Sequence, residues 1–109
     1  MKVSLYGYDK SVATFFGENL SNGDIVKISD SFTVEKANAG DDFCGVVIHA
    51  EKGYVSVQTK GYVELPCAGL TDLGYTNLES DGDKGVVEGS GSRQLLVVSL
   101  ESGLAGIIL

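Results

Sequence analysis

The centre of the chain, residues 43–66, alternates polar and apolar side chains with a period of two. In the run Tyr54–Lys60 the odd positions hold Val, Val and Thr, whereas the even positions hold Tyr, Ser, Gln and Lys. This alternation is typical of a half-buried β-strand, because successive side chains of a strand point to opposite faces. Gly53 and Gly61 mark short breaks on either side of this run. The segment therefore predicts three consecutive strands in a tight β-meander.

Short β-type runs separated by turns recur along the rest of the chain, at intervals of about 8–12 residues. Asn22 and Gly23 form a strong turn signal, and Leu95–Leu100 is the strongest apolar run of the second half. The 15 glycines and the single proline fit a chain with many tight turns. We therefore predict an all-β fold, a small β-barrel or sandwich of short antiparallel strands with Gly-rich turns and little helix.

The same alternation predicts which side chains form the core. One face of each run is apolar, and the predicted core residues are Val26, Ile28, Val34, Val47, Val55, Val57, Val63, Leu96, Val98 and Leu100. Phe32 is expected on the buried side with Val34. The nearly continuous apolar run Gly45–Ala50 predicts a strand that is covered on both faces.

The length of the chain, 109 residues, is enough for one domain and too small for two. We expect residues 21–109 to form a single β domain. Residues 1–20 are expected to form either the first strand or an N-terminal arm. If they form an arm, a chain that lacks residues 1–17 should still fold.

The charge of the chain argues against nucleic-acid partners. The formal net charge is −7 and the pI is about 4.4, and the eight Lys and Arg residues are scattered. Nucleic-acid affinity depends mainly on basic side chains that neutralise phosphates. Charged residues also interrupt the first 20 residues, and no stretch approaches the roughly 18 apolar residues of a spanning helix. We predict neither a nucleic-acid partner, nor a membrane partner, nor a signal peptide.

The two cysteines, Cys44 and Cys67, each have apolar neighbours. This setting favours buried, reduced thiols with a packing role, as in a reducing compartment. A disulfide between them stays open, since the sequence does not give their separation. The chain has one histidine and no Cys-x-x-Cys pair, so no metal site is predicted.

Two further segments contain groups that could carry chemistry. His49 lies in a strand-like run without a marked nucleophile or carboxylate partner, so we expect a satisfied or half-exposed histidine. In the acidic loop 79–85, Asp81 and Asp83 alternate as in a calcium loop, but Lys84 interrupts them and no closing Glu follows. A solvated turn is favoured. We predict no catalytic residue, no cofactor and no metal, and therefore a protein that is not an enzyme.

Five segments occur in an order that resembles a known family. They are Asn22–Ser29, Thr33–Ala37, Gly40–Val47, Gly53–Gln58 and Gly61–Pro66. In this order they resemble the small head-decoration (capsid cement) proteins of tailed bacteriophages, over roughly residues 23–98. The resemblance implies a β-rich protein that binds the major capsid protein as a homotrimer. It also implies localisation on the capsid surface of the virion, after synthesis in the cytoplasm of the bacterial host.

The leading functional hypothesis is a phage virion structural protein that binds the outer capsid surface and stabilises the expanded head. It involves no small-molecule substrate. The alternative is a small β-barrel head–tail joining or tail protein of a phage or prophage. A carbohydrate-active accessory domain is a third hypothesis, which the sequence disfavours because it positions no pair of carboxylates.

The two ends of the chain provide the candidate contacts with capsid or with other copies. Exposed apolar ends are poorly tolerated on a free monomer but are useful when a partner buries them. The candidates are Val12, Phe15, Phe16, Ile107, Ile108 and Leu109. The alternative is that both ends complete the barrel as edge strands.

Overall fold

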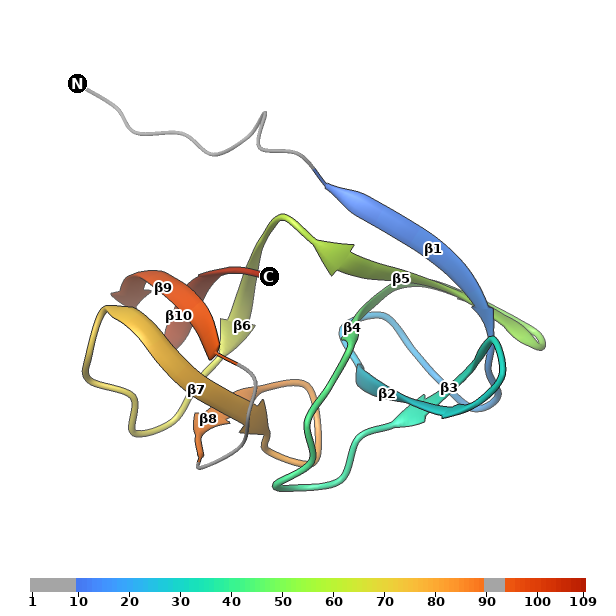
Figure 1. Ribbon diagram of the computed structural model, residues 1–109, viewed down its shortest axis with the longest axis horizontal. Coiled ribbons are helices and arrows are strands. Elements are labelled where there is room, and N and C mark those ends of the chain that lie inside the picture. The colour runs from blue at the N-terminus through green and yellow to red at the C-terminus, as the bar shows by residue number, and fades with distance from the viewer. Residues whose placement is uncertain (1–9, 90–93) are drawn as a thin grey trace.

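The computed structural model describes residues 10–89 and 94–109, and in this part of the chain it contains ten β-strands and no helix (Figure 1). The first half comprises β1 (Ser11–Phe16), β2 (Ile25–Asp30), β3 (Thr33–Lys36), β4 (Gly45–Glu51) and β5 (Tyr54–Lys60). The second half comprises β6 (Tyr62–Pro66), β7 (Gly74–Ser80), β8 (Val86–Glu88), β9 (Gln94–Glu101) and β10 (Leu104–Ile108). The predicted all-β fold is confirmed.

The strands form two β units. The first five close into a barrel in the order β1-β3-β2-β4-β5, and the last five form a sheet in the order β6-β10-β9-β7-β8. The barrel closes through a parallel contact between Phe16 of β1 and Thr33 of β3, whereas its other strand pairs are antiparallel. A parallel bridge between Cys67 and Val86 joins the two outer ends of the second sheet. Nearly every strand contact is therefore antiparallel, as predicted.

The chain crosses from the barrel to the second sheet at Gly61, which has a φ of 102°. The buried amide of Gln58 holds this crossing, since its Nε2 donates to the carbonyl oxygens of Lys60 (3.2 Å) and Tyr62 (3.0 Å). The amide of Leu109 donates to the Gly61 carbonyl at 2.9 Å. The C-terminus is thus fixed to the connection between the two units.

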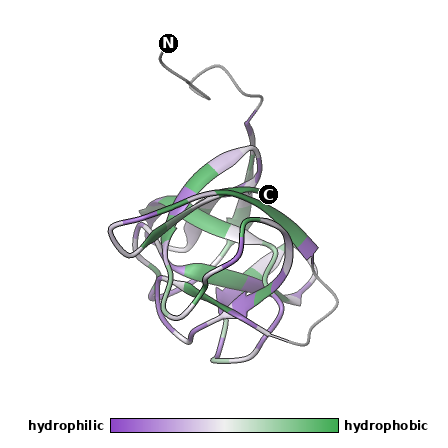
Figure 2. Ribbon diagram, turned by 90° about the vertical axis from the view of Figure 1, so that its left-hand side faces the viewer, coloured by the Kyte–Doolittle hydropathy of each residue, from purple (hydrophilic) through white to green (hydrophobic). Residues whose placement is uncertain are grey.

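Two hydrophobic cores fill the molecule. The barrel core consists of Val26, Val34, Val47, Val55 and Val57. The shared core lies between the barrel and the second sheet, and its buried members are Ile25, Ala37, Phe43, Val46, Leu65, Leu78, Val86, Leu95, Val97, Ala105 and Ile107. Figure 2 shows hydrophobic stretches along the strands that enclose these cores.

Strands β2 and β4 contribute to both cores. Ile25 of β2 pairs with Val46 of β4, and both side chains enter the shared core. The next residues along each strand, Val26 and Val47, enter the barrel core. The expectation that Gly45–Ala50 is covered on both faces is confirmed at its start. It is wrong further along, because Ile48 and His49 are exposed.

The predicted core is confirmed for Val26, Val34, Val47, Val55 and Val57, which are all buried. Val63, Leu96 and Leu100 are half-buried, and Ile28 and Val98 are exposed, so the core prediction is wrong for the last two. Ile28 is exposed because β2 pairs with β4 only at its first two residues and then extends past the barrel wall beside β3 alone.

A β-bulge explains the error in β9. Leu95 and Val97 face the shared core, so Leu96 lies on the opposite face. The register between β9 and β10 shifts at Val98, which is the extra, exposed residue. The bulge reverses the alternation, and Leu100 again packs against the shared core.

The close contact between Gly45, at the start of β4, and strand β5 suggests a stability test. A Cβ on Gly45 would collide with the backbone carbonyl oxygen of Gln58 and with Val57 Cγ1. We expect Gly45→Ala to lower the free energy of unfolding by about 2–3 kcal/mol, as overpacking does. Gly103→Ala is the matched control, since Gly103 has open space around it and only its φ of 78° is unfavourable to alanine.

The control should lose only about 1 kcal/mol, the usual penalty of a left-handed residue. Urea denaturation of the three proteins measures both changes. Equal losses for the two variants would contradict the close packing of β4 against β5.

Candidate interaction surface

Three exposed aromatic residues lie at one end of the barrel, where two of the rings are in contact and the third residue is joined to them through the backbone. Phe16 of β1 pairs with Tyr54 of β5, and their ring centroids are 5.8 Å apart. The amide of Phe16 donates to the carbonyl oxygen of Phe32, in the β2–β3 turn, at 2.8 Å. The exposed fractions are 54% for Phe16, 76% for Phe32 and 53% for Tyr54. We call these three residues the barrel-end aromatic surface.

Phe32 has an unfavourable backbone conformation. Its φ is 53°, in the left-handed region, which costs an L-residue with a Cβ about 1–2 kcal/mol. In the described residues, eight glycines have positive φ, whereas Asn19, Phe32 and Ser102 are the only other residues that do. Because its ring is mostly exposed, packing inside the chain does not offset this strain. Strain of this kind is often retained where a residue serves binding.

The predicted contacts of the N-terminal segment divide into two groups. Val12 and Phe16 are exposed, whereas Phe15 is half-buried and packs against the barrel core. All six residues of β1 pair with β5, so residues 11–16 form a wall of the barrel. Removal of residues 1–17 would delete this wall, and the expectation that such a chain still folds is revised. Residues 1–9 of the segment 1–20, for which an arm or a first strand was expected, lie outside the described residues.

The predicted C-terminal contacts are largely enclosed. Ile107 is fully buried in the shared core, and Ile108 and Leu109 are half-buried. Residues 104–108 form β10, which lies between β6 and β9. Ile107 is therefore a core residue in this fold and is not available to a partner.

Sequence reasoning missed Phe32 and Tyr54 as surface residues. Phe32 is exposed and not on the buried side with Val34, because the turn ends at Phe32 and β3 begins one residue later. The Asp30-Ser31 turn was the sequence signal that could have predicted this exposure. In this turn the Asp30 carboxylate accepts a hydrogen bond from the Ser31 amide at 2.7 Å. A residue that follows such a turn directly can lie outside the alternation of the next strand.

The acidic loop at residues 81–85 is fixed to the barrel. Lys84 Nζ donates to Asp24 Oδ1 at 2.8 Å, to Ser21 Oγ at 3.0 Å and to the Asn22 carbonyl at 2.9 Å. Lys36 Nζ lies 3.9 Å from the same Asp24 oxygen and 3.1 Å from Asp83. Lys84 therefore links the second sheet to the turn before β2, so the predicted solvated turn is also an anchor between the two units.

Asp24 is the buried acceptor of this link, with an exposed fraction of 3%. Burial raises the pKa of its carboxyl group. The hydrogen bonds from Lys84 and the Ser21 amide, with the charges of Lys84 and Lys36, outweigh burial, so the pKa lies below the ordinary 3.8. The folded state therefore favours the ionised form.

His49 and the two cysteines are the other residues whose chemistry the sequence singled out. His49 is exposed, and its Nε2 lies 3.1 Å from Glu51 Oε1. Cys44 and Cys67 are half-buried and are not joined by a disulfide, and they pack against the barrel core and the shared core respectively. Burial raises the pKa of the Cys67 thiol. Both thiols thus have the packing role that the sequence suggested.

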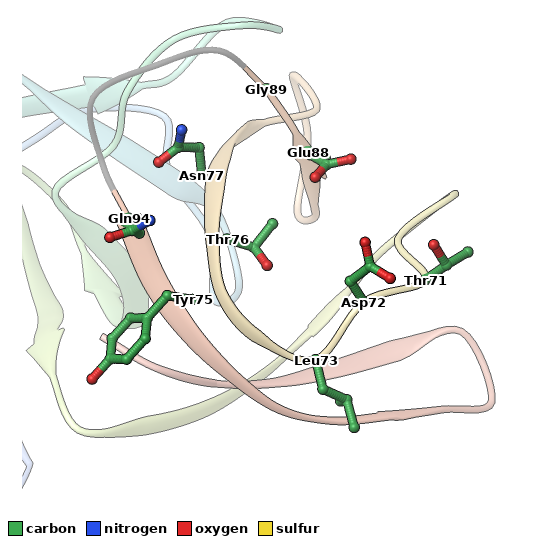
Figure 3. Close-up of a pocket in the computed structure, with 9 residues that line it drawn as sticks. All are labelled: Thr71, Asp72, Leu73, Tyr75, Thr76, Asn77, Glu88, Gly89 and Gln94. Atoms are coloured by element: carbon green, nitrogen blue, oxygen red, sulfur yellow. The ribbon is translucent and has the colours of Figure 1, made fainter.

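A polar groove of about 670 Å³ lies beside β7 in the second sheet (Figure 3). It is open to solvent, and its lining residues are Thr71, Asp72, Leu73, Tyr75, Thr76, Asn77, Glu88, Gly89 and Gln94. Within residues 10–89 and 94–109, no group of three or more His, Cys, Asp or Glu side chains could hold a metal ion. The described part of the chain also has no helix long and apolar enough to cross a membrane.

Comparison with protein-family models finds no match to this chain, and comparison with curated proteins finds no relative. Its function therefore has to be inferred from its own sequence pattern and surface.

The link between Lys84 and Asp24 generates a pH-dependent prediction. Lys84→Met should lower the free energy of unfolding by about 1–2 kcal/mol near pH 7, since it leaves a buried carboxylate without its main donor. The folded pKa of Asp24 is depressed, so its contribution to stability is present above the unfolded value of about 3.9 and is lost as the pH falls through the folded value.

The difference between wild type and variant should therefore be largest above about pH 5 and should shrink below about pH 4. Urea denaturation across this range measures it. Lys52→Met is the control, because no ion pair joins Lys52 to the described residues. A difference that does not change with pH would show that the charge of Asp24 is not involved.

Proposed function

We propose that this protein is a virion structural protein of a tailed bacteriophage, which binds the outer capsid surface and stabilises the expanded head. The resemblance of residues 23–98 to head-decoration proteins supports this proposal. The matched segments correspond to strands β2 to β6 of an all-β fold, a fold class that the resemblance implies.

The observation that carries the proposal is the exposed, strained Phe32 within the barrel-end aromatic surface. Phe32 destabilises the free chain in two ways. Its ring is 76% exposed, so apolar surface is hydrated, and its left-handed backbone is strained. A partner that buries the ring would recover the first contribution. Aromatic anchors of this kind dominate the energy of protein–protein interfaces.

The mechanism would be the addition of buried surface at joints between capsid subunits. Three rings make a small contact, so each copy alone would bind weakly. A homotrimer would present three such contacts at once, and the repeated lattice would make the joint attachment strong. The major capsid protein is then the partner, and the capsid surface of the virion is the location of the protein.

The alternative function is a head–tail joining or tail protein of a phage or prophage. The same aromatic surface could bind a ring of subunits at the portal vertex or in the tail. The two functions differ in the number of copies per particle, because a decoration protein occupies the whole lattice and a joining protein occupies one vertex.

Replacement of Phe32 by Asn separates binding from folding. Asn tolerates positive φ and keeps a turn residue at this position, so Phe32→Asn should raise the free energy of unfolding by about 1 kcal/mol. The same change should weaken binding to expanded empty capsids at least about tenfold, since it removes an aromatic anchor. Co-sedimentation with expanded capsids and urea denaturation measure the two effects.

Tyr75→Ala is the matched control, because Tyr75 is an exposed aromatic residue of the second sheet, and its capsid binding should equal that of the wild type. Equal binding by Phe32→Asn and wild type would contradict the role of the aromatic surface. If the wild-type protein does not bind expanded capsids of its own phage at micromolar concentration, the decoration proposal fails and the joining or tail function replaces it.

A further inference from the structure

The polar groove beside β7 is independent of the barrel-end aromatic surface, since it lies on the second sheet. Its outer side carries Tyr75, Asn77 and Gln94. Tyr75 and Asn77 share one face of β7, and Asn77 pairs directly with Gln94 of β9. Figure 3 shows these three side chains on one side of β7, whereas Thr76 lies on the other. The register of the strands therefore brings one aromatic ring and two primary amides to a common face.

These three side chains are not used by the fold. The ring of Tyr75 is 71% exposed, and no aromatic contact joins it to the described residues. Within the same residues, no side-chain hydrogen bond involves the Tyr75 hydroxyl or the amides of Asn77 and Gln94. The groove thus presents an exposed ring and two amides, each of which can both donate and accept hydrogen bonds.

The chemistry of the lining restricts the class of ligand. Asp72 and Glu88 contribute carboxylates, and the part of the lining that the structure describes contains no Lys, Arg or His, so these residues favour a neutral ligand over an anionic one. The exposed lining is more polar than apolar, which differs from the apolar centre of a protein–protein interface. A neutral, polar ligand fits these properties best.

We propose that this groove binds a neutral oligosaccharide. A sugar ring has an apolar face of C–H groups, which can pack on the face of Tyr75, and hydroxyl groups at its edge, which both donate and accept hydrogen bonds. Asn77 lies two residues from Tyr75 along the strand, a spacing of about 7 Å. The ring and the two amides therefore suit neighbouring units of one sugar chain, and the open side of the groove lets the chain continue beyond it.

The volume of about 670 Å³ agrees with this ligand, because binding pockets for small molecules usually measure about 300–1,000 Å³. The proposal concerns binding and not cleavage. It goes beyond the proposed virion function and does not depend on it.

The test uses the full-length protein on a glycan array that carries neutral, sialylated and sulfated oligosaccharides, followed by titration calorimetry with the best neutral glycan. We expect binding to neutral glycans, with Tyr75→Ala weakening it at least about tenfold and Gln94→Ala weakening it several-fold. Because Tyr75 and Gln94 are exposed, both variants should keep the thermal midpoint of the wild type.

Tyr54→Ala is the matched control, since it removes an exposed tyrosine from the other unit, and its glycan affinity should equal that of the wild type. Three results would overturn the proposal: no binding to any neutral glycan, equal or tighter binding to sulfated and sialylated glycans, or binding that survives Tyr75→Ala. None of these results affects capsid binding through the barrel end, so the two proposals fail separately.

Discussion

The fold depends on two strands whose neighbouring residues enter different cores. Ile25 and Val46 pack into the shared core, while Val26 and Val47 pack into the barrel core. A strand can do this only where both of its faces are covered, and here the barrel interior covers one face and the second sheet covers the other. Strands β2 and β4 are therefore the wall that the two units share, and the salt bridge from Lys84 to Asp24 fixes the same junction from outside.

This arrangement leaves one end of the barrel free. The second sheet packs on one side, while the tip of the β4–β5 hairpin and the end of β1 lie away from β6–β10 (Figure 1). The barrel-end aromatic surface lies at this free end, where Phe16, Phe32 and Tyr54 do not contribute to either core. A rigid barrel that presents exposed rings on strand ends and a tight turn is suited to hold them in one orientation for a partner.

The sequence was informative where local alternation decides the structure, and it failed where distant contacts decide it. Period-two patterns predicted the strands of the central meander and all five buried residues of the barrel core. They could not show the bulge at Val98 or the end of β2–β4 pairing before Ile28, because both depend on the partner strand. The salt bridge of Lys84 with Asp24 joins residues 60 positions apart, so the alternation could not predict this anchor between the two units. The left-handed conformation of Phe32 depends on turn geometry, so the alternation could not predict the barrel-end aromatic surface either.

The most direct test of the central claim is a cryo-electron-microscopy reconstruction of expanded capsids saturated with this protein. Our account predicts added density at every equivalent lattice position, arranged as trimers, with Phe16, Phe32 and Tyr54 buried against capsid subunits. Added density only at the portal vertex would contradict the decoration function. A lattice-wide layer that contacts the capsid through the second sheet, with the three rings exposed to solvent, would contradict the assigned surface.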